Sequence, residues 1–211
     1  MPRHLRVIHA GGIYHVVNRG NDKRVIFPHP ADYDRFIALL QQGRSRAPVL
    51  VIAFCLMPNH FHLVLQPLTP QALSIYMQWV TCSYAGQFRR RTNTQGFGHV
   101  FQRRFWAAPV GDDVGFFRLV RYVEGNARRA QLVPRAEDWR WTSLVDRLQD
   151  SPKIIDPCPL QLPAPWCDWV NLGLHDAALD EIRRALKKVK TTGKRSVSAG
   201  VTGKSCRSSD S

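Results

Sequence analysis

The stretch Met57–Leu65 reads MPNHFHLVL and follows the nearly continuous apolar run Val49–Cys55. A Met-Pro-Asn turn between two apolar runs predicts a β-hairpin whose second strand spans His60–Gln66. Side chains alternate between the two faces of a strand, so His60 and His62 point the same way and the apolar residues between them point the other way. Two imidazoles on one rigid strand are candidates for a pair of metal ligands, although strand histidines taken alone more often have a structural role.

A second candidate group lies in Arg121–Asn126, which reads RYVEGN. The apolar spacing before and through it predicts a helix over residues 112–130, with an aspartate as its N-cap. On a helix, Tyr122 and Asn126 are four residues apart and share one face. Gly125 and Asn126 are poor helix-interior residues, so they also fit a helix that bends or ends early. The group is therefore a candidate site with an aromatic hydroxyl and an amide.

The remaining elements alternate along the chain. Strands are expected at residues 13–19 and 104–110, and helices at residues 30–46, 70–91 and 176–189. The order strand, helix, hairpin, helix, strand, helix predicts an α+β fold. We expect a ferredoxin-like antiparallel sheet with helices on one face, plus an added helix that bears Tyr122.

Three regions are expected in the chain: a folded domain over residues 1–148, a Pro-rich segment with a C-terminal helix over 149–190, and a basic tail over 191–211. The tail is rich in Ser, Thr, Gly and Lys, which predicts disorder. The five cysteines form no CxxC pair, which argues against a disulfide framework and a zinc-cysteine site.

The chain of 211 residues carries a formal net charge of +14 and has a pI of about 10.3. So large a positive charge favours a polyanionic partner, and nucleic acid is the usual one. No apolar stretch is long enough for a membrane span or a signal peptide, so we expect a cytoplasmic, nucleoid-associated protein without a membrane partner. Two histidines, a tyrosine and an amide in such a chain suggest phosphodiester chemistry with tyrosine as nucleophile.

Longer matches support this interpretation. The stretch Met57–Leu65 resembles the HUH motif (histidine, bulky apolar residue, histidine) of the single-tyrosine transposases. Gly98–Ala107, Arg121–Val133 and Trp139–Ser143 resemble the later motifs of one branch, the REP-associated tyrosine transposases. The resemblance extends over residues 11–143, and the combination of motifs at these distances is specific.

The resemblance implies an enzyme that cuts and rejoins single-stranded DNA next to short hairpins, through a 5′-phosphotyrosine intermediate and with a divalent metal, Mg²⁺ or Mn²⁺. Carried over by position, Tyr122 is the nucleophile, and His60, His62 and Asn126 are the metal ligands. A neighbouring carboxylate, Glu124, is the alternative ligand, although on a helix it points away from Asn126. The partner is single-stranded or hairpin DNA, and the protein acts as a monomer or a homodimer.

Basic and aromatic side chains are expected to hold the DNA, because arginines bind phosphates and rings stack on bases. The candidates are Arg3, Arg6, Arg19, Arg103, Arg104, Trp106, Arg121 and Arg128. For the residues around Arg103 and Arg104, an ordinary strand with Phe105 in the core is an equally good interpretation.

Two segments depart from the branch pattern. Residues 126–130 read NARRA where the branch usually has NPVRA, and residues 187–191 read KKVKT in place of an RGRPFG-like stretch. The first change leaves Asn126 in place. The second motivates an alternative function, that of a catalytically decayed relative that only binds hairpin nucleic acid. A metal-dependent RNA nuclease is a third hypothesis.

Overall fold

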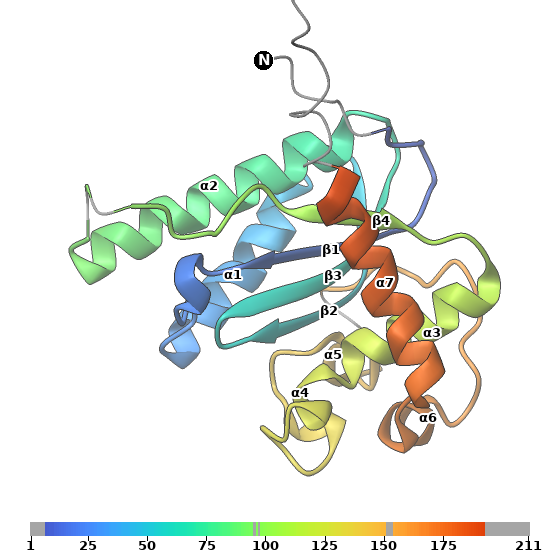
Figure 1. Cartoon of the computed structure of the whole chain (residues 1–211). Coiled ribbons are helices and arrows are strands. Elements are labelled where there is room, and N and C mark those ends of the chain that lie inside the picture. Colours follow the sequence, from blue (N-terminus) through green and yellow to red (C-terminus); the bar gives the residue numbers. More distant parts are fainter. Residues whose placement is uncertain (1–6, 95, 97, 151–153, 193–211) are drawn as a thin grey trace, which may run out of the picture.

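A four-stranded antiparallel sheet forms the centre of the protein, in the order β2–β3–β1–β4 (Figure 1). The computed structural model describes residues 7–94, 96, 98–150 and 154–192. The strands are β1 (Tyr14–Arg19), β2 (Val49–Met57), β3 (His60–Pro67) and β4 (Trp106–Pro109). This strand order, with a helix between β1 and β2 and another between β3 and β4, confirms the predicted ferredoxin-like α+β class.

The predicted hairpin is confirmed. Met57 and His60 face each other at its end, so Pro58 and Asn59 alone make the turn. Its backbone is held by the neighbouring loop, because Gly20 N donates to Asn59 O at 2.9 Å. The register of β3 against β1 pairs His62 with Val17, which puts the histidines of β3 in the middle of the sheet rather than at its edge.

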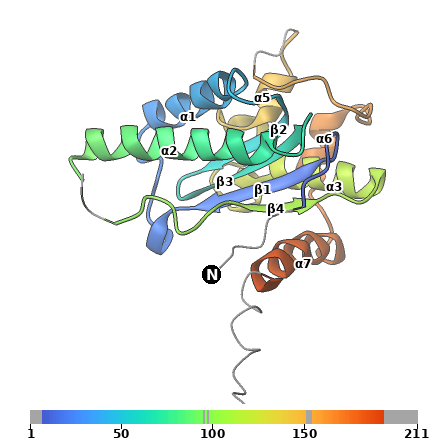
Figure 2. The same ribbon diagram turned by 90° about the horizontal axis from the view of Figure 1, so that it is seen from above.

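Helices α1 (Pro30–Gly43) and α2 (Ala72–Thr92) cover one face of the sheet (Figure 2). Phe61 and Leu63, the β3 residues beside the histidines, are fully buried in this layer. Helix α1 ends three residues earlier than expected, and α2 covers nearly its predicted range. This apolar layer holds β3 rigidly, so the histidines are presented on the opposite face.

That opposite face carries α3 (Asp113–Glu124) and α7 (Asp176–Thr192), together with α4 (Asn126–Arg129) (Figure 1). Asp112 is the N-cap of α3 as predicted, since its side chain accepts a hydrogen bond from Gly115 N at 2.6 Å. The prediction of one helix over residues 112–130 is wrong, because the helix breaks at Gly125.

The backbone is closely packed at the break. A Cβ at Gly125 would lie 3.1 Å from Arg121 O and 3.5 Å from Val170 O. Val170 belongs to α6 (Trp166–Leu172), a short helix that the sequence did not predict. The chain therefore turns at Gly125 while α6 packs against the end of α3.

Three other short helical elements of the described chain lie in the connections. These are the 3₁₀ helices Asn21–Lys23 and Ala136–Asp138, and α5 (Ser143–Arg147). Helix α7 continues through Thr192, two residues into the segment expected to be disordered, and residues 193–211 lie outside the described part of the chain. The four cysteines of the described residues are free thiols. In the described ranges, no helix has the length and apolar character needed to cross a bilayer.

Candidate active site

His60 and His62 lie side by side on the sheet face that α3 covers. Their ring centroids are 5.1 Å apart. His62 is buried, and His60 is half-buried at the start of β3. The register places Arg19 of β1 opposite His60.

The neighbours of His60 define its protonation. His60 Nδ1 lies 2.7 Å from Asn59 Oδ1, and the Asn59 amide is oriented by its Nδ2, which donates to Lys23 O at 3.1 Å. An amide oxygen only accepts hydrogen bonds, so His60 carries its proton on Nδ1. The lone pair of Nε2 is then free to bind a metal ion, as in metal sites where the second ring nitrogen donates to a neighbouring group.

Tyr122 projects from α3 toward these histidines. Its ring centroid is 5.6 Å from that of His62 and meets it edge-on, and its residue is 7% exposed. Tyr76 and Tyr84, by contrast, donate their hydroxyls to the backbone carbonyls of Leu40 and Ile26. Tyr122 is thus the tyrosine that the fold brings beside the HxH pair, although about sixty residues separate them in the chain.

Asn126 and Tyr122 are joined by one arginine. The Arg129 guanidinium lies 4.0 Å from the Tyr122 ring centroid, and Arg129 Nη2 donates to Asn126 Oδ1 at 2.6 Å. Arg129 Nη1 also donates to the Tyr122 carbonyl at 3.2 Å. These contacts hold the phenol, the amide and a positive charge in one cluster, in spite of the break at Gly125.

The buried environment keeps the imidazoles neutral. Burial, together with the positive charges of Arg19 and Arg129, lowers the pKa of His60 to about 4. Burial, followed by the charges of His15 and His60, lowers the pKa of His62 well below its ordinary value. A neutral imidazole is the form that binds a metal ion.

The donor set fits a divalent metal. His60 Nε2 and a ring nitrogen of His62 are neutral donors, and Asn126 Oδ1 has a second lone pair beside the one that Arg129 uses. Asn126 Nδ2 is buried and has no hydrogen-bond partner among the described residues, so the amide is held by its oxygen alone. Within the described residues, no group of three or more His, Cys, Asp or Glu side chains has metal-site spacing, so the candidate set depends on the amide.

Glu124, the alternative ligand, is used elsewhere. It is fully buried and accepts hydrogen bonds from Ser143 Oγ at 2.6 Å, Arg147 Nη2 at 2.9 Å and Trp166 Nε1 at 2.6 Å. These contacts tie the end of α3 to α5 and α6. They also explain the serine of the Trp139–Ser143 motif, whose hydroxyl is a partner of this carboxylate.

Comparison with known proteins identifies the family of this chain. The family model described as "Transposase IS200 like" matches residues 10–126, more than half of the chain. This chain belongs to the IS200-like transposase family. A Haemophilus influenzae protein named as a REP-associated tyrosine transposase is 23% identical over 154 residues, which cover 68% of this chain and 85% of that protein.

A solved structure has the same fold. It is described as a REP-associated tyrosine transposase bound to a REP hairpin, and it matches with a TM-score of 0.57 at 16% identity. The match covers 78% of this chain and 96% of the other. The region that matches the family model ends at Asn126, one of the candidate site residues.

The residues expected to bind DNA lie in several places. Arg103 and Arg104 are exposed before β4, and Trp106 is half-buried within it. Asn18 Nδ2 donates to Arg103 O at 3.2 Å, which ties this segment to the end of β1. Phe105 is in the core, as the alternative interpretation expected. Arg3 and Arg6 lie outside the described residues.

Two further arginines turn toward α6. Arg121 Nη2 donates to Gly173 O, and the Arg121 guanidinium lies 5.4 Å from the centroid of the Trp169 ring, which is 43% exposed. Arg128 lies near the same glycine. Both are therefore directed toward Gly173 at the end of α6, whereas Arg129 is the arginine that contacts Tyr122.

Sequence reasoning missed His15 and Arg129. His15 Nε2 lies 2.9 Å from His62 Nδ1, and both residues are buried. His15 lies within the strand predicted over residues 13–19, but only the register against β3 shows that it shares a face with His62. Arg129 is seven residues after Tyr122, a spacing that would have put both on one side of the helix predicted over residues 112–130.

Proposed function

We propose that this protein cuts and rejoins single-stranded DNA next to hairpins, through a covalent link between Tyr122 and a 5′-phosphate. The observation that carries the proposal is the position of the Tyr122 ring beside the paired histidines of β3, with Arg129 on its face. Membership of a transposase family supports strand transfer as the outcome. The hairpin named for the structural relative, and the net charge of +14, support hairpin DNA as the partner.

The chemistry assigns one task to each side chain. The Tyr122 oxygen attacks the phosphorus and loses its proton, the bond to the 3′ oxygen breaks, and the upstream strand leaves with a 3′-hydroxyl. A phenol is a better leaving group than an aliphatic alcohol, so a 3′-hydroxyl can later displace it and rejoin DNA without ATP. Arg129, whose guanidinium lies over the Tyr122 ring, would stabilise the negative charge that develops at the attacked phosphate.

His60, His62 and Asn126 would hold a divalent ion, Mg²⁺ or Mn²⁺. When bound, it supplies a Lewis acid that neutralises the phosphate charge and orients the phosphate for in-line attack. The protein keeps the two histidines in a fixed orientation, because β3 is held by the apolar layer behind it. We further propose that exposed Arg103 and Arg104, with Trp106, guide the single strand toward the site, and that the protein acts on DNA in the cytoplasm.

An end-labelled hairpin oligonucleotide with single-stranded flanks tests the proposal, in the presence of Mn²⁺. A 3′-end label is expected to move with the protein on a denaturing gel, whereas a 5′-end label is expected to appear on a shortened free strand. Tyr122→Phe should bind the hairpin normally and form no adduct. The matched change Tyr33→Phe, in a ring stacked 4.0 Å from Trp141, should leave the adduct intact.

Other outcomes identify the alternatives. An undiminished adduct from Tyr122→Phe would exclude Tyr122 as nucleophile. Tight hairpin binding with no adduct from the wild-type protein would favour the decayed, binding-only relative. Faster cleavage of a matched ribo-oligonucleotide would favour the RNA nuclease.

A further inference from the structure

His15 has a buried polar side chain, and the proposed reaction gives it no role. It is the second residue of β1 and is 3% exposed. Its Nε2 is 2.9 Å from His62 Nδ1, and the two rings stack with centroids 5.1 Å apart and planes 25° apart. The Tyr122 ring meets His15 edge-on at 5.9 Å. A buried imidazole in contact with both a candidate ligand and the candidate nucleophile is placed to affect the site.

The hydrogen bond between the two histidines permits two arrangements of protons. In the first, His62 Nδ1 donates to His15 Nε2, and His62 Nε2 keeps its lone pair. In the second, His15 Nε2 donates to His62 Nδ1, so that neutral His62 carries its proton on Nε2 and cannot bind a metal there. Only the first arrangement makes His62 a ligand like His60, whose Nδ1 donates to Asn59 Oδ1.

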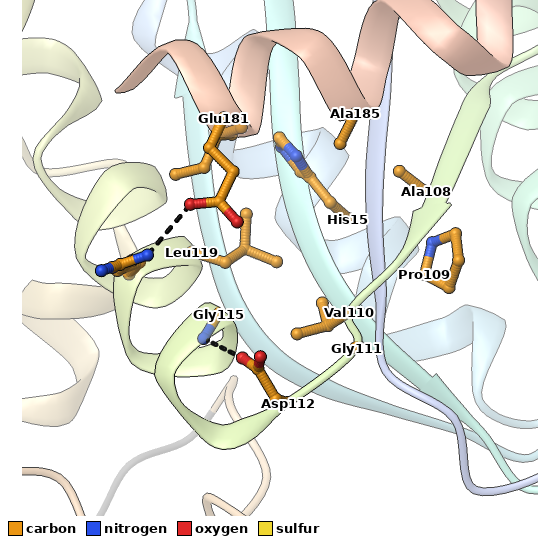
Figure 3. A pocket seen from close by; sticks show the side chains of 12 residues that line it. His15, Ala108, Pro109, Val110, Gly111, Asp112, Gly115, Leu119, Glu181 and Ala185 are labelled. Atoms are coloured by element: carbon orange, nitrogen blue, oxygen red, sulfur yellow. Dashed lines mark hydrogen bonds and ion pairs between the residues drawn. The ribbon is translucent and has the colours of Figure 1, made fainter. Parts of the chain in front are cut away.

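The surroundings of His15 allow the first arrangement. In this arrangement His15 must carry its own proton on Nδ1. The His15 ring borders a cavity of about 180 Å³ between β4, α3 and α7, which Ala108, Leu119 and Ile182 also line (Figure 3). A space of this size with polar groups on its wall can hold water, so the Nδ1 proton can be hydrated rather than buried without a partner.

We propose that His15 is a positioning residue, which accepts the Nδ1 proton of His62 and so directs His62 Nε2 toward the metal and the scissile phosphate. The inference rests on the proposed function of His62 as a ligand. It adds a role for a residue of a different strand, through a contact that depends on the β1–β3 register. Loss of such a supporting hydrogen bond typically weakens metal binding 10- to 100-fold.

Two substitutions separate hydrogen bonding from packing. His15→Phe keeps a ring in the space and removes the acceptor, whereas His15→Gln can accept with its side-chain oxygen. Val16→Ala, at the adjacent fully buried position on the opposite face of β1, is the control for a general loss of stability. Mn²⁺ affinity is measured by titration calorimetry at one fixed pH, and the position of the His62 proton by ¹⁵N–¹H correlation spectra of the metal-free protein.

In the wild-type protein, the His62 proton is expected on Nδ1. His15→Phe should move it to Nε2 and weaken Mn²⁺ binding about 10- to 100-fold, and His15→Gln should recover most of the affinity. Val16→Ala should lower the melting temperature without changing Mn²⁺ affinity. Wild-type affinity in His15→Phe, or a wild-type His62 proton on Nε2, would overturn the role of His15. A wild-type protein with its His62 proton on Nδ1 but no Mn²⁺ binding would instead overturn the proposed metal site.

Discussion

Replacing Glu124 with alanine is expected to lower the free energy of unfolding by about 3–5 kcal/mol, the cost of removing one partner from a buried ion pair. The Glu124 carboxylate is fully buried, and Arg147, its partner at 2.9 Å, is only 15% exposed. The change also leaves Trp166 Nε1 and Ser143 Oγ without their acceptor. The large effect arises because water cannot replace the carboxylate at this position.

Glutamine at the same position gives a graded comparison. Its oxygen can still accept from Ser143 and Arg147, but its amide nitrogen then faces the Trp166 N–H. One unpaired buried donor costs about 1–3 kcal/mol, so Glu124→Gln should lie between alanine and wild type. Glu181 provides the matched control, because its carboxylate is 62% exposed and pairs with Arg118 at the surface. Glu181→Gln should change stability by at most about 1 kcal/mol.

Urea denaturation followed by circular dichroism measures these differences, and the alanine variant should melt about 6–20 °C below wild type. Mn²⁺ affinity of the folded Glu124→Gln protein should equal that of wild type, because Glu124 is not a ligand. A stability loss no larger than that of Glu181→Gln would refute the structural role. Lost Mn²⁺ binding in a stably folded Glu124→Gln would restore Glu124 as a ligand.

Two more predictions concern the charges around the site. Arg129→Met should slow adduct formation about 10- to 100-fold in single-turnover assays, with hairpin affinity unchanged, because it removes the group that orients Asn126. The control is Arg128→Met, at the preceding residue, which lies near Gly173. Equal slowing by Arg128→Met would contradict the role of Arg129. Metal-free protein should lose stability as the pH falls from 6.5 toward 4. Burial lowers the pKa of His15 to about 3 and that of His60 to about 4, so the unfolded chain binds more protons in this range. The loss approaches about 1.4 kcal/mol per pH unit for each histidine, and a flat profile in urea titrations would count against neutral imidazoles.

Local signals in the sequence were sufficient for most of the fold. The β2–β3 hairpin followed from two apolar runs around a Met-Pro-Asn turn, and α1 and α2 from helical spacing of apolar residues. Helix α6 has no such signal, since it is short and follows a Pro-rich segment. Its position is set by Val170, which is 1% exposed against the end of α3. Contacts of this kind depend on tertiary packing, which single-sequence patterns do not contain.

The residues of the candidate site also fall into two groups, those that sequence patterns indicate and those that only the folded structure shows. Motif and spacing were sufficient to nominate His60, His62, Tyr122 and Asn126 as candidates. They could not select His15, because its contact with His62 requires the register of two strands separated by 47 residues. Residues of the same strand or the same helix can be related by periodicity, whereas a contact between strands depends on how the whole sheet is assembled.

The break between α3 and α4 is where a local sequence signal and tertiary packing act on the same residues. Glycine and asparagine are unfavourable inside a helix, yet here they stand between the last turn of α3 and the first of α4, so that Tyr122 and Asn126 both reach Arg129. The break is held from outside the matched family region, by Val170 against Gly125. The segment after residue 149 is therefore part of what positions the candidate ligand Asn126. Two residues of low helix propensity are therefore tolerated at this site, because the surrounding structure fixes the local backbone geometry.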